Sequence, residues 1–378
     1  MSRPRVLVVS FSDISQDARV LRQVRLLAPR YEVTTCGYGP APDGVADHVR
    51  IPDDLIYWHK DRRLLLERRY AAAYRTSPVV AYLWDRLPRS YFDVVLADDV
   101  DTVPLALSLH PRRGVHADLH EYAPRQNEES WRWRTFVAPY VRWLVGRFVP
   151  LAASVTTVGQ GLADEYRREF GIEAGVVANA CAYRDAAPTP VGRPIRLVHS
   201  GLARPNRSLE VMVDAVEATS ADVTLDLYLM PNDPPYLAEL RARTAGSDRV
   251  TLHDPVPHDD LVETIARYDV GVFVLPPLNF NYRWALPNKF FDFVQGRLGI
   301  IVGPSPEMAH LVREHALGAV TGGFTTGDLV AVLDALTPEE VARWKAGSHA
   351  AARRLSSDTQ VQGWLRAVEA LVEGGSSR

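Results

Sequence analysis

Residues 276–302 read PPLNFNYRWALPNKFFDFVQGRLGIIV and directly follow a short apolar run at residues 271–275. Proline suits the start of a helix, where its missing N–H would have no partner, so Pro287 predicts a helix that runs to about residue 297. Gly299 lets the chain turn into another apolar run at residues 300–302. Strand, loop, helix and strand therefore follow one another here, which is the repeating unit of a parallel α/β sheet.

The start of this predicted helix carries residues that suit a nucleotide. Lys289 and Asp292 are three residues apart, so we expect them on one exposed face. The free amides of a helix start, together with a lysine, favour a diphosphate, and a carboxylate one turn later can accept hydrogen bonds from two ribose hydroxyls. An ordinary solvated ion pair on a strand–loop–helix unit would explain the same residues.

Two motifs resemble those of the retaining glycosyltransferases of family four. The words LPNKFFDF at residues 286–293 and SGLARPNRSLEVMVDA at residues 200–215 look like the two nucleotide-sugar motifs of that family, and the likeness covers nearly the whole chain. The resemblance implies the GT-B fold, an α/β architecture of two Rossmann-like domains whose parallel sheets face a cleft. It also implies transfer of a sugar from a nucleotide-diphosphate sugar to an acceptor, with retained anomeric configuration.

The same resemblance assigns roles to the second motif. Arg207 stands where the family usually has a lysine, Leu202 stands at the usual arginine, and Arg204 lies two residues further as a candidate substitute. Gly201 would let the backbone approach the ligand. The arginines and Lys289 would stabilise the leaving diphosphate, so no metal ion or cofactor is expected. The implied nucleotide-sugar site comprises Gly201, Arg204, Arg207, Pro287, Asn288, Lys289 and Asp292.

One position departs from the family pattern of two acidic residues separated by seven others. Asp292 matches the second acid, but the first would fall at Trp284, which is no carboxylate. Recognition of the donor sugar is therefore open, and Asn279, Asn281 and Tyr282 are candidates for it. The missing acid also permits a catalytically inactive protein that only binds a nucleotide-sugar.

His120 is the catalytic candidate in the first half of the chain. Family members commonly carry a histidine near the transferred sugar at the end of such a strand, and His120 follows the predicted strand 115–119. Open α/β sheets bind ligands at the carboxyl ends of their strands, although a satisfied structural histidine would look the same in sequence. Together with Asp98 and Glu121, His120 could serve a sugar-nucleotide epimerase of the same fold, which is the main alternative. The sequence Asp-Val-Asp at residues 99–101 is expected to be a loop and a helix cap, not a metal site.

The first loop, residues 12–17, lacks the glycines of a dinucleotide fingerprint, which argues against an NAD site. Asp17 with Arg19 resembles a pattern of one subgroup of the family, whose members often place donor or acceptor contacts on this loop. Capping of the following helix by Ser15 or Asp17 explains these residues equally well.

Length and alternation predict two domains. The 378 residues are 47% hydrophobic, enough for two α/β cores, and predicted strands alternate with helices throughout. We place an acceptor-side domain at residues 1–182, a proline-rich linker at 183–194 and a nucleotide-sugar domain at 195–356. A last helix at 357–373 is expected to cross back to the first domain, as is usual in this fold.

Composition limits the partners and the compartment. A net charge of −3 gives no electrostatic case for nucleic acid, and two cysteines without a pattern suit a reducing cytoplasm. The segments 58–87 and 130–149 mix arginines with tryptophan and tyrosine, as helices at a membrane surface do. The donor is thus expected to be a nucleotide-sugar, and the acceptor is either lipid-linked or membrane-proximal, with the protein peripheral at the membrane, or a soluble metabolite. In the second case the arginines only solvate a helix face.

Overall fold

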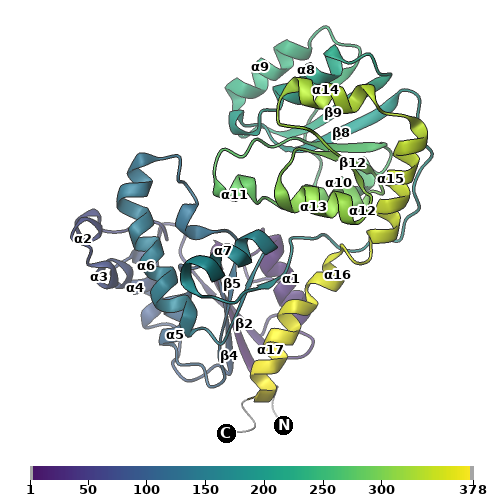
Figure 1. Cartoon of the computed structure of the whole chain (residues 1–378). Helices are drawn as coiled ribbons and strands as arrows, with labels where there is room; N and C mark the ends of the chain where they lie inside the picture. Colours follow the sequence, from purple (N-terminus) through teal and green to yellow (C-terminus); the bar gives the residue numbers. More distant parts are fainter. Residues whose placement is uncertain (1–2, 375–378) are drawn as a thin grey trace. The chain divides into compact units, whose positions relative to one another are not determined.

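The computed structural model describes residues 3–374, apart from the side chain of His258, and the chain forms two compact α/β units (Figure 1). The first unit holds the chain up to residue 178, the short segment 279–281 and the chain from residue 361 onward. The second unit holds residues 179–278 and 282–360. Each unit has one sheet whose paired strands are all parallel, so the predicted α/β fold class is confirmed.

The sheet of the first unit has seven strands in the order β3-β2-β1-β4-β5-β6-β7. The central strand β1 contains the run Val6–Val9, whose side chains are all fully buried because helices cover both faces of the sheet. The direction in which strands are added reverses between β1 and β4. The strands are β1 (Arg5–Asp13), β2 (Glu32–Tyr38), β3 (Asp47–Arg50), β4 (Val94–Asp98), β5 (Gly114–Leu119), β6 (Ser154–Thr157) and β7 (Gly175–Val176).

The sheet of the second unit has six strands in the order β10-β9-β8-β11-β12-β13. Counted within the unit, this is 3-2-1-4-5-6, the order of the doubly wound nucleotide-binding fold, and it reverses between β8 and β11. A ligand in such a sheet is expected beyond the carboxyl ends of the strands at that point. The strands are β8 (Ile195–Leu202), β9 (Val223–Met230), β10 (Val250–His253), β11 (Val270–Phe273), β12 (Gly299–Val302) and β13 (Gly318–Val320).

The helices of the first unit differ from the sequence expectation in two places. Residues 58–87 form three short helices, and the segment 130–149 starts with a π-helical turn, Trp133–Val137 (η2), before the main helix. The helices are α1 (Ala18–Leu27), α2 (Arg62–Leu66), α3 (Tyr70–Arg75), α4 (Pro78–Trp84), α5 (Val103–Ser108), α6 (Ala138–Phe148) and α7 (Gln160–Phe170), with 3₁₀ turns η1 (Ala123–Arg125) and η3 (Val149–Leu151).

In the second unit a helix follows almost every strand. Residues 338–351 form a long helix that the sequence analysis did not predict. The helices are α8 (Glu210–Ala218), α9 (Pro234–Thr244), α10 (His258–Ile265), α12 (Asn288–Gln295), α13 (Pro306–Glu314), α14 (Thr326–Asp334), α15 (Pro338–Ala351) and α16 (Ser357–Gln360), with the 3₁₀ turn η4 (Pro205–Arg207). A further short helix, α11 (Phe280–Arg283), bridges the segments assigned to the two units.

The chain ends in helix α17 (Gln362–Gly374), which packs on the first unit. It contacts α1 and the strands β4, β5 and β6, and it can be followed as the yellow helix beside α1 in Figure 1. Trp364 is fully buried under the guanidinium of Arg19, 4.6 Å from its ring centre. Val368 belongs to the same apolar cluster as Val6 and Val8, so the last helix completes the core around the first strand.

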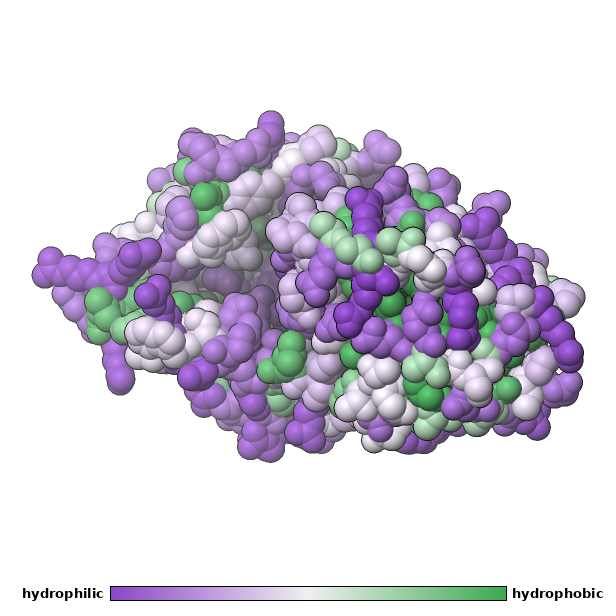
Figure 2. Space-filling model, turned by 90° about the horizontal axis from the view of Figure 1, so that it is seen from above, coloured by the Kyte–Doolittle hydropathy of each residue, from purple (hydrophilic) through white to green (hydrophobic). Residues whose placement is uncertain are grey.

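Among residues 3–374, no helix combines the length and the apolar character that a membrane crossing requires. On the face shown in Figure 2, hydrophilic residues cover most of the surface and hydrophobic ones lie in small groups.

Candidate functional site

A hollow of about 610 Å³ lies in the second unit beyond the carboxyl ends of β8 and β9 and beside the start of α12. One part of its wall is polar and is formed by Ser200, Gly201, Asn288, Lys289 and Asp292. The rest is mainly apolar and is formed by Tyr228, Met230, Pro255, Val256, Pro257 and Leu261. The hollow thus brings four of the predicted site residues together, namely Gly201, Asn288, Lys289 and Asp292.

Helix α12 starts one residue later than predicted. Pro287 occupies the cap position, with φ −80° and ψ 159°, and Asn288 is the first helical residue. The proline places no side-chain acceptor over the first turn. The amides of this turn, which begins with the lining residues Asn288 and Lys289, therefore have no side-chain cap. The helix ends at Gln295, before the predicted end near residue 297, where Arg297 turns the chain with φ 60°.

The expected exposed pair on α12 is wrong. Asp292 is only 2% exposed and Lys289 is half-buried, and every residue from Phe290 to Gln295 is buried. The reason is packing: α12 contacts β11 and β12 on one side and α10 and α15 on others, which leaves no solvent face. Lys289 and Asp292 therefore lie recessed in the wall of the hollow, where they could contact a ligand more directly than a solvated surface pair.

His199 holds the amine of Lys289, although the sequence analysis did not single it out. The Nζ atom of Lys289 lies 3.3 Å from Nε2 of His199, whose Nδ1 lies 2.8 Å from the carbonyl oxygen of Val272. Nδ1 can only donate to that carbonyl. Burial and the nearby Lys289 hold the pKa of His199 well below its usual range, so the ring is neutral and Nε2 is the acceptor. Burial and the nearby Arg207 lower the pKa of Lys289 to about 7, against an opposing effect of Asp292.

Gly201 makes room for this lysine. Its φ is +150°, and a Cβ atom there would lie 2.4 Å from Nζ of Lys289. A side chain at position 201 would therefore displace the ammonium group. Gly201 thus makes room for Lys289, and the close approach of its backbone to a ligand stays a prediction.

The two arginines of the second motif differ in their surroundings. Arg207 ends the turn η4 and is half-buried, with its guanidinium 4.7 Å from the ring centre of Tyr282. Asn206 donates a 2.9 Å hydrogen bond to the Tyr282 hydroxyl, so both hold this ring. Arg204 is exposed and does not line the hollow. Of the two arginines, Arg207 is thus the one whose charge lowers the pKa of Lys289.

A second hollow, of about 180 Å³, lies in the first unit beyond the carboxyl ends of β1, β4 and β5. It sits where the strand order reverses, which is the expected place for a ligand. Its lining residues are Ser10, Phe11, Ser12, Tyr57, Asp98, Asp99, Val100, Asp101, Thr102, His120, Glu121, Ala123 and Gln126. It therefore includes His120 and both acids, Asp98 and Glu121, that we considered with it.

The residues 99–101 form a loop as expected, but the predicted helix cap is wrong. Thr102 caps α5, and no side chain accepts from its first amides. Asp99 accepts a 3.1 Å hydrogen bond from the His120 amide, and Asp101 forms an ion pair with Lys60 at 3.8 Å. Both carboxylates are thus engaged at the hollow and not at the helix.

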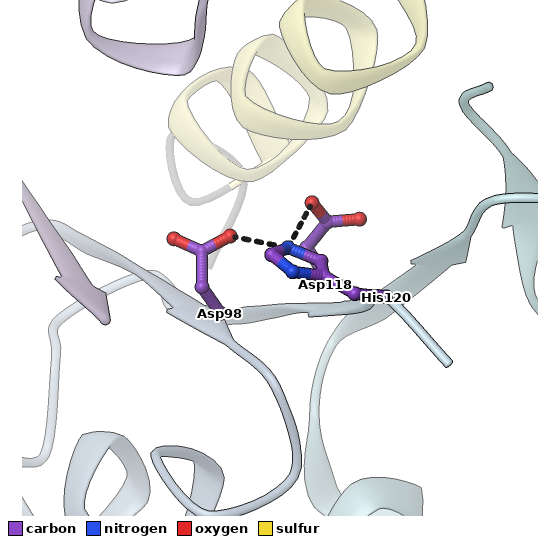
Figure 3. Close-up of side chains that lie close together, drawn as sticks. All are labelled: Asp98, Asp118 and His120. Atoms are coloured by element: carbon purple, nitrogen blue, oxygen red, sulfur yellow. Dashed lines mark ion pairs between the residues drawn. The ribbon is translucent and has the colours of Figure 1, made fainter. Parts of the chain in front are cut away.

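The His120 ring is surrounded by carboxylates, as Figure 3 shows for Asp98 and Asp118. Its Nε2 lies 3.5 Å from Asp98 and 3.7 Å from Asp118, and its Nδ1 lies 3.4 Å from Asp99. Burial alone would lower the pKa of His120, but the three carboxylates raise it well above its usual range. The ring is therefore a charged imidazolium at neutral pH.

Asp118 is fixed by groups of the first unit. Arg19 donates to both of its oxygens at 2.7 and 2.8 Å, Gln23 donates to one at 2.8 Å, and the Thr156 hydroxyl donates to the other at 2.7 Å. Burial opposes ionisation, yet Arg19 and His120 hold the pKa of Asp118 well below its usual range. Arg19 is thus buried in the first unit, and Asp17, which accepts from two amides of α1, is the helix cap that the alternative reading predicted.

Asp98, Asp118 and His120 are also close enough to hold a metal ion, with ligand atoms within 4.8 Å of one another. Asp118, however, already accepts from Arg19, Gln23 and Thr156, so a metal ion would have to displace a guanidinium. The positive charges of Arg19 and His120 balance the two carboxylates without one.

No protein-family model matches the sequence, and a comparison with curated proteins gives no significant match. Solved structures match over nearly the whole chain. Anabaena Alr3699/HepE in complex with UDP-glucose has a TM-score of 0.70 at 14% identity, and the alignment covers 97% of this chain and 99% of that one.

Two synthases give similar agreement. Sucrose-phosphate synthase from Thermosynechococcus elongatus has a TM-score of 0.71 at 11% identity, covering 98% of this chain and 100% of that one. Trehalose 6-phosphate synthase from Burkholderia multivorans has the same TM-score and identity, with 99% and 100% covered. These neighbours are GT-B proteins, so the fold expected from the two motifs is confirmed.

Proposed function

We propose that this protein is a glycosyltransferase that moves a sugar from a nucleotide-diphosphate sugar to an acceptor. The observation that carries the proposal is the arrangement around Lys289 at the open start of α12, with Gly201 making room for it and His199 holding it. The pKa of the Lys289 amine is about 7, so an anion that binds beside it favours uptake of a proton by this amine. The complexes of HepE with UDP and UDP-glucose support the same kind of donor, as do the two motifs.

The hollow offers a separate surface for each part of such a donor. Its apolar wall, with Tyr228 and Pro255–Pro257, suits the flat base of UDP or GDP. The amides of Asn288 and Lys289 and the lysine amine suit the diphosphate. Asp292, recessed below them, is the carboxylate that would accept from the ribose hydroxyls.

Charge stabilisation on the leaving diphosphate is the main contribution that such a reaction needs from the protein. Lys289, Arg207 and the helix amides provide it, so we propose a transfer that needs neither a metal ion nor a cofactor. Attack from the face of the leaving group, with a diphosphate oxygen taking the acceptor proton, would retain the anomeric configuration. His120, which is charged, would serve as a hydrogen-bond donor to a hydroxyl of a reacting sugar.

The test is incubation of the full chain with UDP- and GDP-sugars, with and without candidate acceptors. Release of nucleoside diphosphate that depends on an acceptor supports transfer. Release without an acceptor points to an epimerase or a hydrolase, and binding without turnover points to a catalytically inactive partner. Either of these two results overturns the proposed transfer.

We further propose a cytoplasmic protein that docks on the anionic surface of a membrane through its first unit. The docking surface is formed by residues 58–69 and 130–136, and α2 packs beside η2 within it. Trp58, Leu66 and Trp131 expose 66%, 63% and 59% of their surface, an unusual exposure for large apolar side chains.

Charge favours an anionic membrane as the partner of this docking surface. Its two segments contain seven basic side chains and only two acidic ones, Asp61 and Glu67, in a chain whose net charge is −3. Each basic residue near an anionic bilayer contributes about 1 kcal/mol. Aromatic side chains among arginines are typical of proteins that lie on a membrane surface, and docking there would bring the enzyme to a lipid-linked acceptor.

A further inference from the structure

The hollow of the first unit has a strongly acidic lining. Asp98, Asp99, Asp101 and Glu121 all contribute to it, and among the lining residues His120 is the one basic side chain. Lys60 lies behind Asp101 and neutralises that carboxylate alone. The hollow of the second unit is less acidic, because Lys289 lines it together with a single carboxylate, Asp292, and Arg207 lies nearby.

One oxygen of Asp98, a residue that lines the hollow, has no hydrogen-bond partner among the described residues. The Asp98 side chain is fully buried, and its Oδ1 accepts a 2.8 Å hydrogen bond from Gln23. Its Oδ2 has no hydrogen-bond partner within residues 3–374. A buried acceptor without a partner is costly, so a ligand that donates a hydrogen bond there would satisfy it.

The remaining lining suits a sugar ring. Ser10 and Ser12 share a 2.8 Å hydrogen bond and present hydroxyl groups, while the rings of Phe11 and Tyr57, with centres 5.9 Å apart, offer apolar faces. Carboxylates accept hydrogen bonds only, and sugar hydroxyls can donate them. The volume of about 180 Å³ corresponds to roughly six water molecules, so the hollow takes a group of about one ring.

Phosphate fits this lining poorly. A phosphate group brings nearly two negative charges to a place that already holds several carboxylates, and like charges at short range repel strongly when solvent is scarce. Arginine, the usual partner of phosphate, is absent from the lining residues. The names of sucrose-phosphate synthase and trehalose 6-phosphate synthase indicate phosphorylated sugars as their products, so this chain would differ from them.

We infer that the hollow of the first unit binds the acceptor as a hydroxyl-rich ring that carries no phosphate or carboxylate. The role of this ring as the acceptor rests on the proposed transferase function, whereas the selection for an uncharged or amine-bearing polyol rests on the lining alone. The ring is either a free sugar or the sugar end of a glycolipid, since both present the same chemistry.

Saturation-transfer NMR on the full chain, with D-glucose, D-glucosamine and D-glucose 6-phosphate as probes, tests the selection. Glucose and glucosamine should receive saturation, and the phosphate ester should receive at least fivefold less. A stronger signal from glucose 6-phosphate than from both other probes overturns the inference, and so does the absence of signal from both uncharged and amine-bearing probes. Octyl glucoside, added below its micellar concentration, distinguishes the sources: a signal above that of glucose indicates a glycolipid end, and an equal or lower one a free sugar.

Substitutions locate the binding. Asp98→Asn keeps the shape of the side chain and the oxygen that accepts from Gln23, but it puts an NH2 group, which only donates, in the place of Oδ2. If this buried variant fails to fold, Asp99→Asn alters the exposed carboxylate of the hollow in the same way. Each should lower the glucose signal at least threefold, while Asp53→Asn, which affects only a surface pair with Arg50, should leave it unchanged. Glucose binding that survives both hollow variants places the sugar elsewhere and overturns the inference.

The same samples, titrated with UDP and GDP, separate this inference from the proposed function. Binding of the sugar probes without binding of either nucleotide refutes the nucleotide-sugar donor and leaves the hydroxyl-binding hollow intact. Nucleotide binding without sugar binding refutes the hollow alone.

Discussion

The affinity for a nucleoside diphosphate should fall as the pH rises above 7, and Lys289 is the reason. Burial and the neighbouring Arg207 lower the pKa of its amine to about 7 from an ordinary value of 10.5. A diphosphate beside the amine favours the charged form and raises that pKa again. Above pH 7 the protein must therefore take up a proton when the ligand binds, and each further rise in pH makes this harder.

The magnitude follows from the difference between the two pKa values. One pKa unit corresponds to 1.36 kcal/mol, or a factor of ten in affinity. If the bound amine returns close to its ordinary pKa, the affinity falls about tenfold per pH unit, or roughly a hundredfold between pH 7 and pH 9. Below pH 7 the lysine is already charged, so this dependence should level off. Arg207 stays charged throughout and adds no slope.

Calorimetric titration with UDP and GDP at pH 6.5, 7.5, 8.5 and 9 measures this slope. Phosphate has its own second ionisation near pH 6, so the range above 6.5 isolates the lysine. Lys289→Gln should bind more weakly and lose the slope, whereas Arg241→Gln, which alters a surface pair with Asp254, should keep both. An affinity that is constant from pH 7 to pH 9, or a slope that persists in Lys289→Gln, would refute the reasoning.

Three further measurements address the other assignments. Asp292→Asn should weaken nucleoside diphosphate binding by about 1.5–3 kcal/mol, the range for a hydrogen bond to a charged group, and an unchanged calorimetric affinity would place the ribose elsewhere. Arg207→Ala should weaken UDP or GDP binding far more than binding of the bare nucleoside, while equal losses would indicate that it only supports Tyr282. In flotation with anionic liposomes the protein should rise with the lipid at low salt and stay behind at high salt. The double variant Trp58→Ser, Trp131→Ser should stay in the lipid-free fraction at both low and high salt. A native protein that does not float at low salt would contradict the docking surface.

Apolar runs bounded by polar residues predicted the sheets closely. The predicted strands at 115–119 and 300–302 agree with β5 and β12 to within one residue at each end. The alternation of strands and helices over the whole length was enough to predict two parallel sheets. The three-residue strand β13 was too short to stand out, and α15 has no continuous apolar stripe, so its period gave little signal.

The chemistry of the site could be predicted only in part, because it depends on which strands become neighbours. Lys289 and Gly201 were each predicted from a motif, but their contact through His199 requires β8 to pair with β11. His120 was placed at a strand end and Asp98 was considered with it, and the pairing of β4 with β5 brings the two side chains together. The burial of Asp292 also depends on neighbouring elements. The spacing of apolar residues in α12 indicated one buried face, but it could not indicate that α10 and α15 cover other faces of this helix.

The position of α17 has a consequence for how the chain folds during its synthesis. Val368 closes a core that begins with Val6 and Val8, so the first unit cannot complete its apolar cover until the last helix has left the ribosome. At translation rates of about 5–20 residues per second, the interval between the first strand and this helix is roughly 20–70 seconds. The second unit ends at residue 360, just before this helix, so its chain is complete before the first unit can close. The unit whose synthesis begins first is therefore the one whose chain is completed last.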